Sequence, residues 1–296
     1  MPIAFVAGAT GTLGGLIVES LRRRDVQVRA LVRPGNAEGR QALDGRPGVE
    51  VVEGDIRDSV DSLGRTLDGV GVVISAVLGD ADVIVDGQVN LLRAAEKAGV
   101  ARFIPSDFSY DLFRLDPDDN AYSNLRLEAH KAFGESPVAV TSVLPGAFLD
   151  VVHQPYFEHV DWEAGTFSYW GDGDQPIEFT SYADTAEWTA EVALDPTPGP
   201  TVRVAADILT TRGLHQTLER ASGRRLEPRR LGGLDDLKAE IERRKAGSTN
   251  VFDYLALQYA WVMNTGKASF DRLDNDRYPG VEPTRAEEFY RRALNS

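Results

Sequence analysis

Short apolar runs alternate with longer segments of helical period along the first half of the chain. Residues 3–6 form an apolar run of strand type, and leucines and an isoleucine repeat at helical spacing directly behind it. Further strands are expected at residues 26–32, 49–53, 70–77, 101–104 and 138–144. Helices are expected near residue 59 and at 83–98 and 120–133. This alternation predicts a parallel sheet covered by helices on both faces.

Beyond residue 145 the regular alternation stops. Residues 148–165 are aromatic and irregular, and a turn at 171–174 follows a strand-like run at 166–170. A strand is expected at 201–204, and helices at 211–221, 234–244, 250–264 and 284–294. We therefore predict an α/β fold with a Rossmann-type, doubly wound parallel sheet. Residues 1–150 form the nucleotide-binding domain, to which 166–205 return, and residues 151–165 and 206–296 form a smaller, mostly helical substrate region.

Composition narrows the class of protein. The 296 residues are 42% hydrophobic, which suits one large α/β domain or a nucleotide domain with a smaller companion. The net charge of −14 argues against a nucleic-acid partner, and no apolar run approaches the ~20 residues of a membrane span. There is no cysteine, and the first strand begins too early to leave room for a signal peptide. We expect a cytoplasmic protein, monomer or homodimer, that acts on a small molecule without a membrane partner.

A glycine-rich turn joins the first strand to the first helix. Backbone N–H groups can approach a pyrophosphate closely only where side chains are absent, and a helix N-terminus favours negative charge. The pattern thus predicts a dinucleotide site rather than a purely structural turn. Its members are Gly8, Thr10, Gly11, Thr12, Leu13 and Gly14.

The residues after the second and third strands indicate which nucleotide binds. Arg33 stands where an acidic residue would bind the ribose 2′-hydroxyl of NAD, and a guanidinium there suits a 2′-phosphate. We therefore predict NADP(H). Arg40 is either a second phosphate contact or a solvated surface charge. Asp55 either accepts a hydrogen bond from the adenine amine or caps the helix that begins near Ser59.

Several motifs together resemble one family. They are the glycine turn, Arg33, the Ile-Ser-Ala-Val run at 74–77, the Arg-Phe-Ile-Pro-Ser-Asp-Phe run at 102–108, the Leu-Pro-Gly-Ala-Phe run at 144–148, and the motifs at 170–173, 180–184 and 278–284. The chain resembles the atypical short-chain dehydrogenases/reductases of the NmrA-like, isoflavone reductase-like group, over nearly its whole length. The resemblance implies a Rossmann fold and NADP(H). It also implies a nicotinamide side lined by Ser75, Ala76, Val77, Ser106 and Phe108. Pro145, at the carboxyl end of the sixth strand, is a further candidate cofactor contact.

The chain departs from this group on the helix before the sixth strand. Reductases of the group commonly carry a lysine there that contacts the nicotinamide ribose, and this position falls on Arg126. An arginine does not give up its proton, which puts the lysine mechanism in doubt. Tyr122 lies four residues earlier on the same helical face, with His130 one turn beyond. Our hypothesis makes Tyr122 the general acid and Arg126 a source of positive charge and a ribose contact; the alternative is that Tyr122 is a packing aromatic.

The substrate should bind beyond the carboxyl ends of the strands. Candidate contacts are Phe148, His153, Tyr254 and Trp261, among the aromatic residues of 148–162 and 250–264. Aromatic residues at helical spacing are also typical of core packing, and that alternative stays open. Histidine and acid spacing predicts no metal site. The sequence favours an NADPH-dependent reductase of a small aromatic or conjugated substrate, and the alternative is an NmrA-like, NADP(H)-binding redox sensor without turnover.

Overall fold

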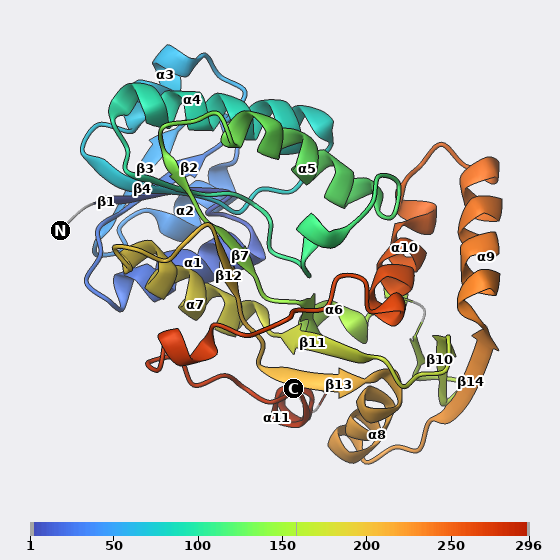
Figure 1. The fold of residues 1–296 in the computed structure, drawn as a ribbon. Helices are drawn as coiled ribbons and strands as arrows, with labels where there is room; N and C mark the ends of the chain where they lie inside the picture. The colour runs from blue at the N-terminus through green and yellow to red at the C-terminus, as the bar shows by residue number, and fades with distance from the viewer. Residues whose placement is uncertain (1–2, 158, 295–296) are drawn as a thin grey trace. The chain divides into compact units, whose positions relative to one another are not determined.

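The computed structural model describes residues 3–157 and 159–294, which divide into two compact units. Unit 1 takes the described residues up to Phe108 together with Leu125–Leu144 and Thr185–Val202. Unit 2 takes Ser109–Asn124, Pro145–Asp184 and the described residues from Arg203 on. Figure 1 shows the elements of both units. None of the described helices is long and apolar enough to cross a membrane.

The sheet of unit 1 is parallel, and its strand order reverses beside the first strand. The order is β3-β2-β1-β4-β5-β6, so β1 lies between β2 and β4. The chain runs from β1 through β2 to β3 on one side of β1 and then crosses to β4 on the other side, which creates the switch point at which such sheets bind ligands. The predicted doubly wound fold is confirmed. The strands are β1 (Ile3–Ala7), β2 (Val28–Val32), β3 (Val49–Glu53), β4 (Val70–Ser75), β5 (Arg102–Ile104) and β6 (Ala139–Val140).

Helices cover both faces of this sheet, as expected. Figure 1 shows α3, α4 and α5 on one face and α1 and α7 on the other. Phe5, Val73 and Phe103 are fully buried in the core, because helices cover the strands on both faces. Such strands are rich in apolar residues. The helices are α1 (Thr12–Arg22), α2 (Ala37–Leu43), α3 (Val60–Thr66), α4 (Gln88–Ala98), α5 (Ala121–Phe133) and α7 (Tyr182–Leu194), the last two partly in unit 1.

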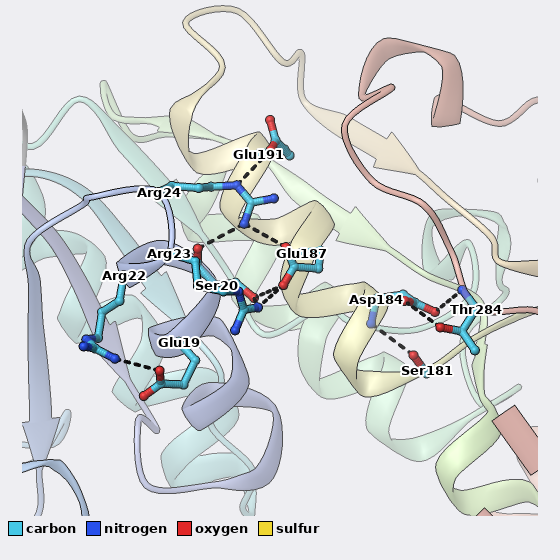
Figure 2. A network of polar contacts seen from close by, with 10 residues as sticks. All are labelled: Glu19, Ser20, Arg22, Arg23, Arg24, Ser181, Asp184, Glu187, Glu191 and Thr284. Carbon is cyan, nitrogen blue, oxygen red and sulfur yellow. Dashed lines mark hydrogen bonds and ion pairs between the residues drawn. The ribbon is translucent and has the colours of Figure 1, made fainter. Parts of the chain in front are cut away.

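An ion-pair network joins α7 to α1 within unit 1 (Figure 2). Glu187 accepts a hydrogen bond from Ser20 Oγ at 2.6 Å and pairs with Arg24 at 2.8 Å and with Arg23. Arg24 also pairs with Glu191 at 2.8 Å. Thus α7, which periodicity alone did not predict, is fixed to the helix that follows the glycine turn.

Two expected elements differ in detail. The strand expected at 138–144 divides into β6 and β7 (Ser142–Leu144). The division occurs because Thr141 N still donates to Phe103 O at 3.0 Å, whereas Ser142 N donates to Pro200 O at 3.0 Å, next to β12 (Thr201–Arg203). The helix expected at 83–98 begins as a π-helix, η1 (Asp82–Gly87), before α4. It ends as predicted at Gly99, whose φ is 71°.

Unit 2 contains two small sheets and four of the helices expected in the second half. The sheets have the orders β14-β10-β9 and β13-β11-β8, and the core holds Phe167, Phe179 and Tyr290. The strands are β8 (Ala147–Phe148), β9 (Val160–Asp161), β10 (Thr166–Trp170), β11 (Pro176–Thr180), β13 (Asp207–Thr210) and β14 (Glu227–Gly232). The helices are α6 (Leu149–Val152), α8 (Thr211–Ser222), α9 (Leu234–Gly247), α10 (Phe252–Thr265) and α11 (Ala286–Ala293), with short 3₁₀ turns η2 (Leu112–Arg114), η3 (Pro155–Phe157) and η4 (Asn275–Arg277).

Candidate functional site

A cavity of about 230 Å³ lies in unit 1 at the carboxyl ends of β1, β2, β3 and β4. This is the switch point of the sheet, where a doubly wound fold binds its ligand. The cavity therefore brings together residues from four loops that are far apart in sequence. Seven of the residues that we predicted to bind the cofactor line it: Gly8, Thr10, Gly11, Arg33, Asp55, Ala76 and Val77.

Glycines allow β1, β4 and α1 to approach one another at this cavity. Gly8 has a φ of 79°, and a methyl group on it would meet the carbonyl carbon of Ala76 at 2.7 Å. A methyl group on Gly14 would meet the carbonyl carbon of Gly8 at 2.7 Å and its oxygen more closely still. Side chains are excluded at both positions. The backbone is thus left bare on the wall that a pyrophosphate needs.

Helix α1 points its N-terminus out of this turn. Gly11 is the N-cap, and no described side chain caps the helix. Helix ends leave N–H groups without intrahelical partners and carry a partial positive charge. The first turn holds Thr12, Leu13 and Gly14, which are not part of the cavity lining, so their contact with a phosphate stays a prediction. Bare backbone, free amides and a cationic wall fit a dinucleotide phosphate.

Three charged residues line the cavity where the chain leaves the carboxyl ends of β2 and β3. Arg33, Asp55 and Arg57 all line it. Arg57 Nε and Nη2 donate to Asp55 Oδ1 and Oδ2, both at 2.8 Å, and the Arg57 guanidinium with help from Arg33 lowers the pKa of Asp55 to about 2. Asp55 is therefore a fixed anion. Arg57 was not identified from the sequence. Its position two residues after Asp55 is a signal from which this ion pair could have been predicted.

The structure bears on the alternatives that the sequence left open for Asp55 and for Arg40. Ser59 caps α3 by accepting from Ser62 N at 3.2 Å, so the alternative that Asp55 caps this helix is wrong. Arg40 lies 3.4 Å from Asp44 and 3.6 Å from Glu53 in ion pairs and is half-exposed. These pairs favour the solvated surface charge for Arg40.

A hydrogen-bonded chain connects the segments after β4 and β5 with α5. Ser106 Oγ donates to Val77 O at 2.8 Å, and Arg126 Nε donates to Ser106 O at 3.0 Å. Arg126 is buried, with 8% of its surface exposed, as are Ser75 and Phe108. The structure thus brings Val77, Ser106 and Arg126 together within unit 1. Their contact with a nicotinamide remains a prediction.

A buried carboxylate holds the histidine of α5. His130 Nε2 lies 2.6 Å from Asp107 Oδ2, which also accepts a hydrogen bond from Ser142 Oγ at 2.7 Å. The Asp107 side chain is 1% exposed. The imidazole is therefore held in a contact inside unit 1. This pairing could not be predicted from the sequence, because Asp107 and its two partners, His130 and Ser142, lie on three separate segments.

Tyr122 lies on α5 four residues before Arg126, as predicted, but its described contacts are in unit 2. Its ring centroid is 6.0 Å from that of Phe252, and 4% of its surface is exposed. This burial agrees with the packing alternative. It does not test the catalytic one.

The predicted substrate contacts belong to unit 2 and are not among the residues that line the cavity. The Phe148 ring is 4.4 Å from the ring of Tyr182, and His153 Nδ1 is 3.2 Å from Leu149 O. Trp261 packs beside the α9–α10 apolar cluster, and Tyr254 is half-buried on α10. Pro145, a predicted cofactor contact, is also in unit 2, where its carbonyl accepts from Thr180 Oγ1 at 2.6 Å.

Two further groups of unit 2 escaped the sequence analysis. Tyr182 N donates to Asp150 Oδ2 at 2.8 Å. Burial raises the pKa of the Asp150 carboxyl, and burial followed by the charge of Asp150 raises the pKa of the Tyr182 phenol. Among residues 3–157 and 159–294, no group of three or more His, Cys, Asp or Glu side chains could hold a metal ion.

Comparison with known proteins shows what this chain is similar to. The model of the NmrA-like family matches residues 3–289. Curated relatives called oxidoreductase swnN come from Arthroderma benhamiae, 30% identical over 44% of this chain and 46% of the relative, and from Metarhizium robertsii, 26% identical over 77% and 75%. The chain thus spans just under half of the first of these relatives.

Solved structures share the fold over the full length. AtPrR2 with NADP+ and (+)pinoresinol is 25% identical, with a TM-score of 0.82 over 98% of this chain and 97% of that one. An isoflavone reductase, 23% identical, has a TM-score of 0.84 over 98% and 99% of the two chains and shows the fold alone. The arrangement of strands described above is therefore one that known reductases also have.

Proposed function

Because the chain belongs to the NmrA-like family, we propose that it is an NADPH-dependent reductase of a small aromatic or conjugated substrate. The observation that carries this proposal is the cavity at the switch point, where a bare glycine wall and Arg33 meet. The relatives called oxidoreductases and the fold shared with AtPrR2, solved with NADP+ and (+)pinoresinol, support it.

We propose that unit 1 holds NADP(H). Gly8, Gly11 and the first turn of α1 would hold the pyrophosphate, and Arg33 would hold the 2′-phosphate. Val77 and Ser106 would line the nicotinamide side. When bound, the reduced nicotinamide supplies a hydride to an electrophilic carbon of the substrate.

The remaining step is delivery of a proton to the product, and the chain's own residues must perform it. We propose that the Tyr122 hydroxyl donates this proton and that Arg126, one turn away on α5, contributes the positive charge that eases its loss. An arginine cannot itself donate the proton at neutral pH. The aromatic residues of unit 2, Phe148, His153, Tyr254 and Trp261 among them, are proposed to contact the substrate.

A second function, an NADP(H)-binding redox sensor without turnover, is favoured by a specific observation. Arg126 occupies the position of the group's lysine, and its Nε is already used by Ser106 O. Such a protein would bind NADPH in unit 1 and leave it unoxidised.

Incubation of the purified protein with NADPH and a panel of aromatic ketones, enones and benzylic ethers separates the two functions. The reductase is expected to oxidise NADPH with at least one member of the panel, followed by the loss of absorbance of the reduced cofactor. Saturable NADPH binding with no oxidation across the panel would contradict the reductase and support the sensor. Size-exclusion chromatography of the same sample distinguishes the monomer from the homodimer.

A further inference from the structure

The adenosine end of the cavity contains a carboxylate beside the arginine proposed to bind phosphate. Asp55 and Arg33 line the same cavity of about 230 Å³, and the positive charge of Arg33 acts on the Asp55 carboxyl. A 2′-phosphate held by Arg33 carries nearly two negative charges at neutral pH. It would be repelled by an uncompensated carboxylate in the same cavity. Something must therefore cancel the charge of Asp55 if the site is to take this phosphate.

Arg57 is placed to do so. Its guanidinium meets both oxygens of Asp55 at 2.8 Å, in the paired geometry that arginine makes with a carboxylate. The backbone N–H of Arg57 also donates to Asp55 Oδ1 at 2.9 Å, and Asp55 N donates to Asp58 Oδ2 at 2.8 Å. The local turn thus fixes the carboxylate against the guanidinium.

Arg57 has a second partner outside the cavity lining. Its Nη1 lies 3.1 Å from Asp82 Oδ2, at the first residue of the π-helix η1. The guanidinium therefore joins the loop after β3 to the segment after β4, whose Val83 forms part of the same cavity wall. With two partners, the guanidinium is held beside the cavity rather than free to swing into solvent.

We infer that Arg57 is a specificity-determining residue for NADPH over NADH, which acts by neutralising Asp55 rather than by contacting the phosphate. The inference rests on the proposed use of NADP(H) in unit 1. Half of the Arg57 side chain is exposed, and exposed ion pairs contribute little to folding stability. Removal of the guanidinium should therefore leave the fold intact and change mainly the charge that the ligand meets.

Equilibrium binding of NADPH and NADH to purified variants, by calorimetry and cofactor fluorescence, tests this without turnover. Arg57→Met should weaken NADPH about tenfold or more, which corresponds to about 1.4 kcal/mol, and NADH less than about threefold. The double variant Asp55→Asn with Arg57→Met should bring the NADPH/NADH preference back to within about threefold of the native value. Asp82→Asn, which removes the outer charge but keeps an oxygen that can accept from Arg57 Nη1, should leave the preference unchanged. The Arg57→Met effect should shrink as salt is raised.

Two results would overturn the inference. Equal losses for both cofactors in Arg57→Met would make Arg57 a structural or adenine contact. A double variant as weak toward NADPH as the single one would mean that the guanidinium contacts the phosphate itself. A native protein that binds NADPH no tighter than NADH would contradict the proposed use of NADP(H), whereas a native preference that Arg57→Met retains would contradict this inference alone.

Discussion

Partly buried acidic residues differ between the two units in the direction in which their pKa values shift. In unit 1, burial alone would raise the pKa of Glu187, but hydrogen bonds from Ser20 and two arginines lower it, and Arg57 lowers the pKa of Asp55 to about 2. In unit 2, burial raises the pKa values of Asp150, Glu178 and Asp184. At these positions, arginines of unit 1 stabilise the charged form of the carboxylate, whereas burial in unit 2 disfavours it.

This difference matches the roles that we propose for the two units. A phosphorylated cofactor is recognised by charges that are already ionised and oriented. An aromatic substrate without charge is better bound among aromatic rings, such as Phe148 and Tyr182, whose centroids are 4.4 Å apart. Variants in unit 1 should therefore change cofactor binding, and variants in unit 2 should change turnover without changing cofactor binding.

Tyr122→Phe gives the largest expected effect and tests whether a residue with its contacts in unit 2 takes part in the chemistry. The loss of the hydroxyl should lower turnover by about 10²- to 10³-fold, because the proton donor is gone, with NADPH affinity unchanged. Steady-state kinetics and equilibrium binding measure the two quantities. Phe252→Leu alters the ring contact of Tyr122 and serves as the packing control. Turnover retained by Tyr122→Phe would leave Tyr122 as a packing residue.

Gly14→Ala should remove cofactor binding from unit 1. The new methyl group collides with the Gly8 carbonyl, so β1 and α1 must separate and the pyrophosphate wall is lost. We expect NADPH affinity to fall more than about 100-fold together with a lower Tm, by analogy with overpacked cores. Gly15→Ala is the matched control, since its methyl group would meet the nearest atom, Ala9 O, at an ordinary 3.5 Å. Tight NADPH binding by Gly14→Ala would show that this wall is not used.

Glu187→Gln weakens the charge network that ties α7 to α1 in unit 1. The contacts of Glu187 with Ser20, Arg23 and Arg24 lose the carboxylate's negative charge. The free energy of unfolding, measured with denaturant, should therefore fall by about 1 kcal/mol at pH 7. The loss should diminish as pH falls below about 4.5. Below this pH, Glu187 is protonated in the unfolded native protein, which stabilises the unfolded state, whereas glutamine in the variant does not titrate. A loss independent of pH would indicate altered packing instead.

Asp150→Asn, in unit 2, should change the free energy of unfolding with a pH dependence opposite in sign to that of Glu187→Gln, and the effect should be the smallest of the set. The native carboxyl has a raised pKa, so folding favours its protonated form, and its cost to stability appears as pH rises through that pKa. Asparagine keeps an oxygen for Tyr182 N and cannot ionise. Its stability relative to the native chain should rise as pH increases above about 4, where an aspartate in the unfolded chain ionises, by less than about 1 kcal/mol. Slopes of the same sign for Asp150→Asn and Glu187→Gln would contradict the contrast between the units.

The amino-acid sequence was most informative where a local pattern decides the structure. The strand, turn and helix around Gly8 follow from spacing over a few residues, and β1 itself is an unbroken apolar run. The burial pattern of β14 offers no such signal, since five of its six residues are exposed and its strand form depends on pairing with β10. The break between β6 and β7 likewise depends on Pro200, almost sixty residues away.

The candidate site shows the same limit. Arg33 could be predicted because one position after a strand decides between two nucleotides. The second partner of Arg57, Asp82, could not be predicted, because it lies in a different loop that only the folded sheet brings close to Arg57. The contact of His130 with Asp107 was hidden for the same reason.

Equilibrium binding of NADPH and NADH to the native protein and to Arg33→Asp tests the cofactor assignment most directly. The native protein should bind NADPH at least about tenfold more tightly than NADH, since a paired guanidinium–phosphate contact is worth that much. Arg33→Asp should abolish this preference by weakening NADPH far more than NADH. Equal loss for the two cofactors, or a native protein without preference, would contradict the account.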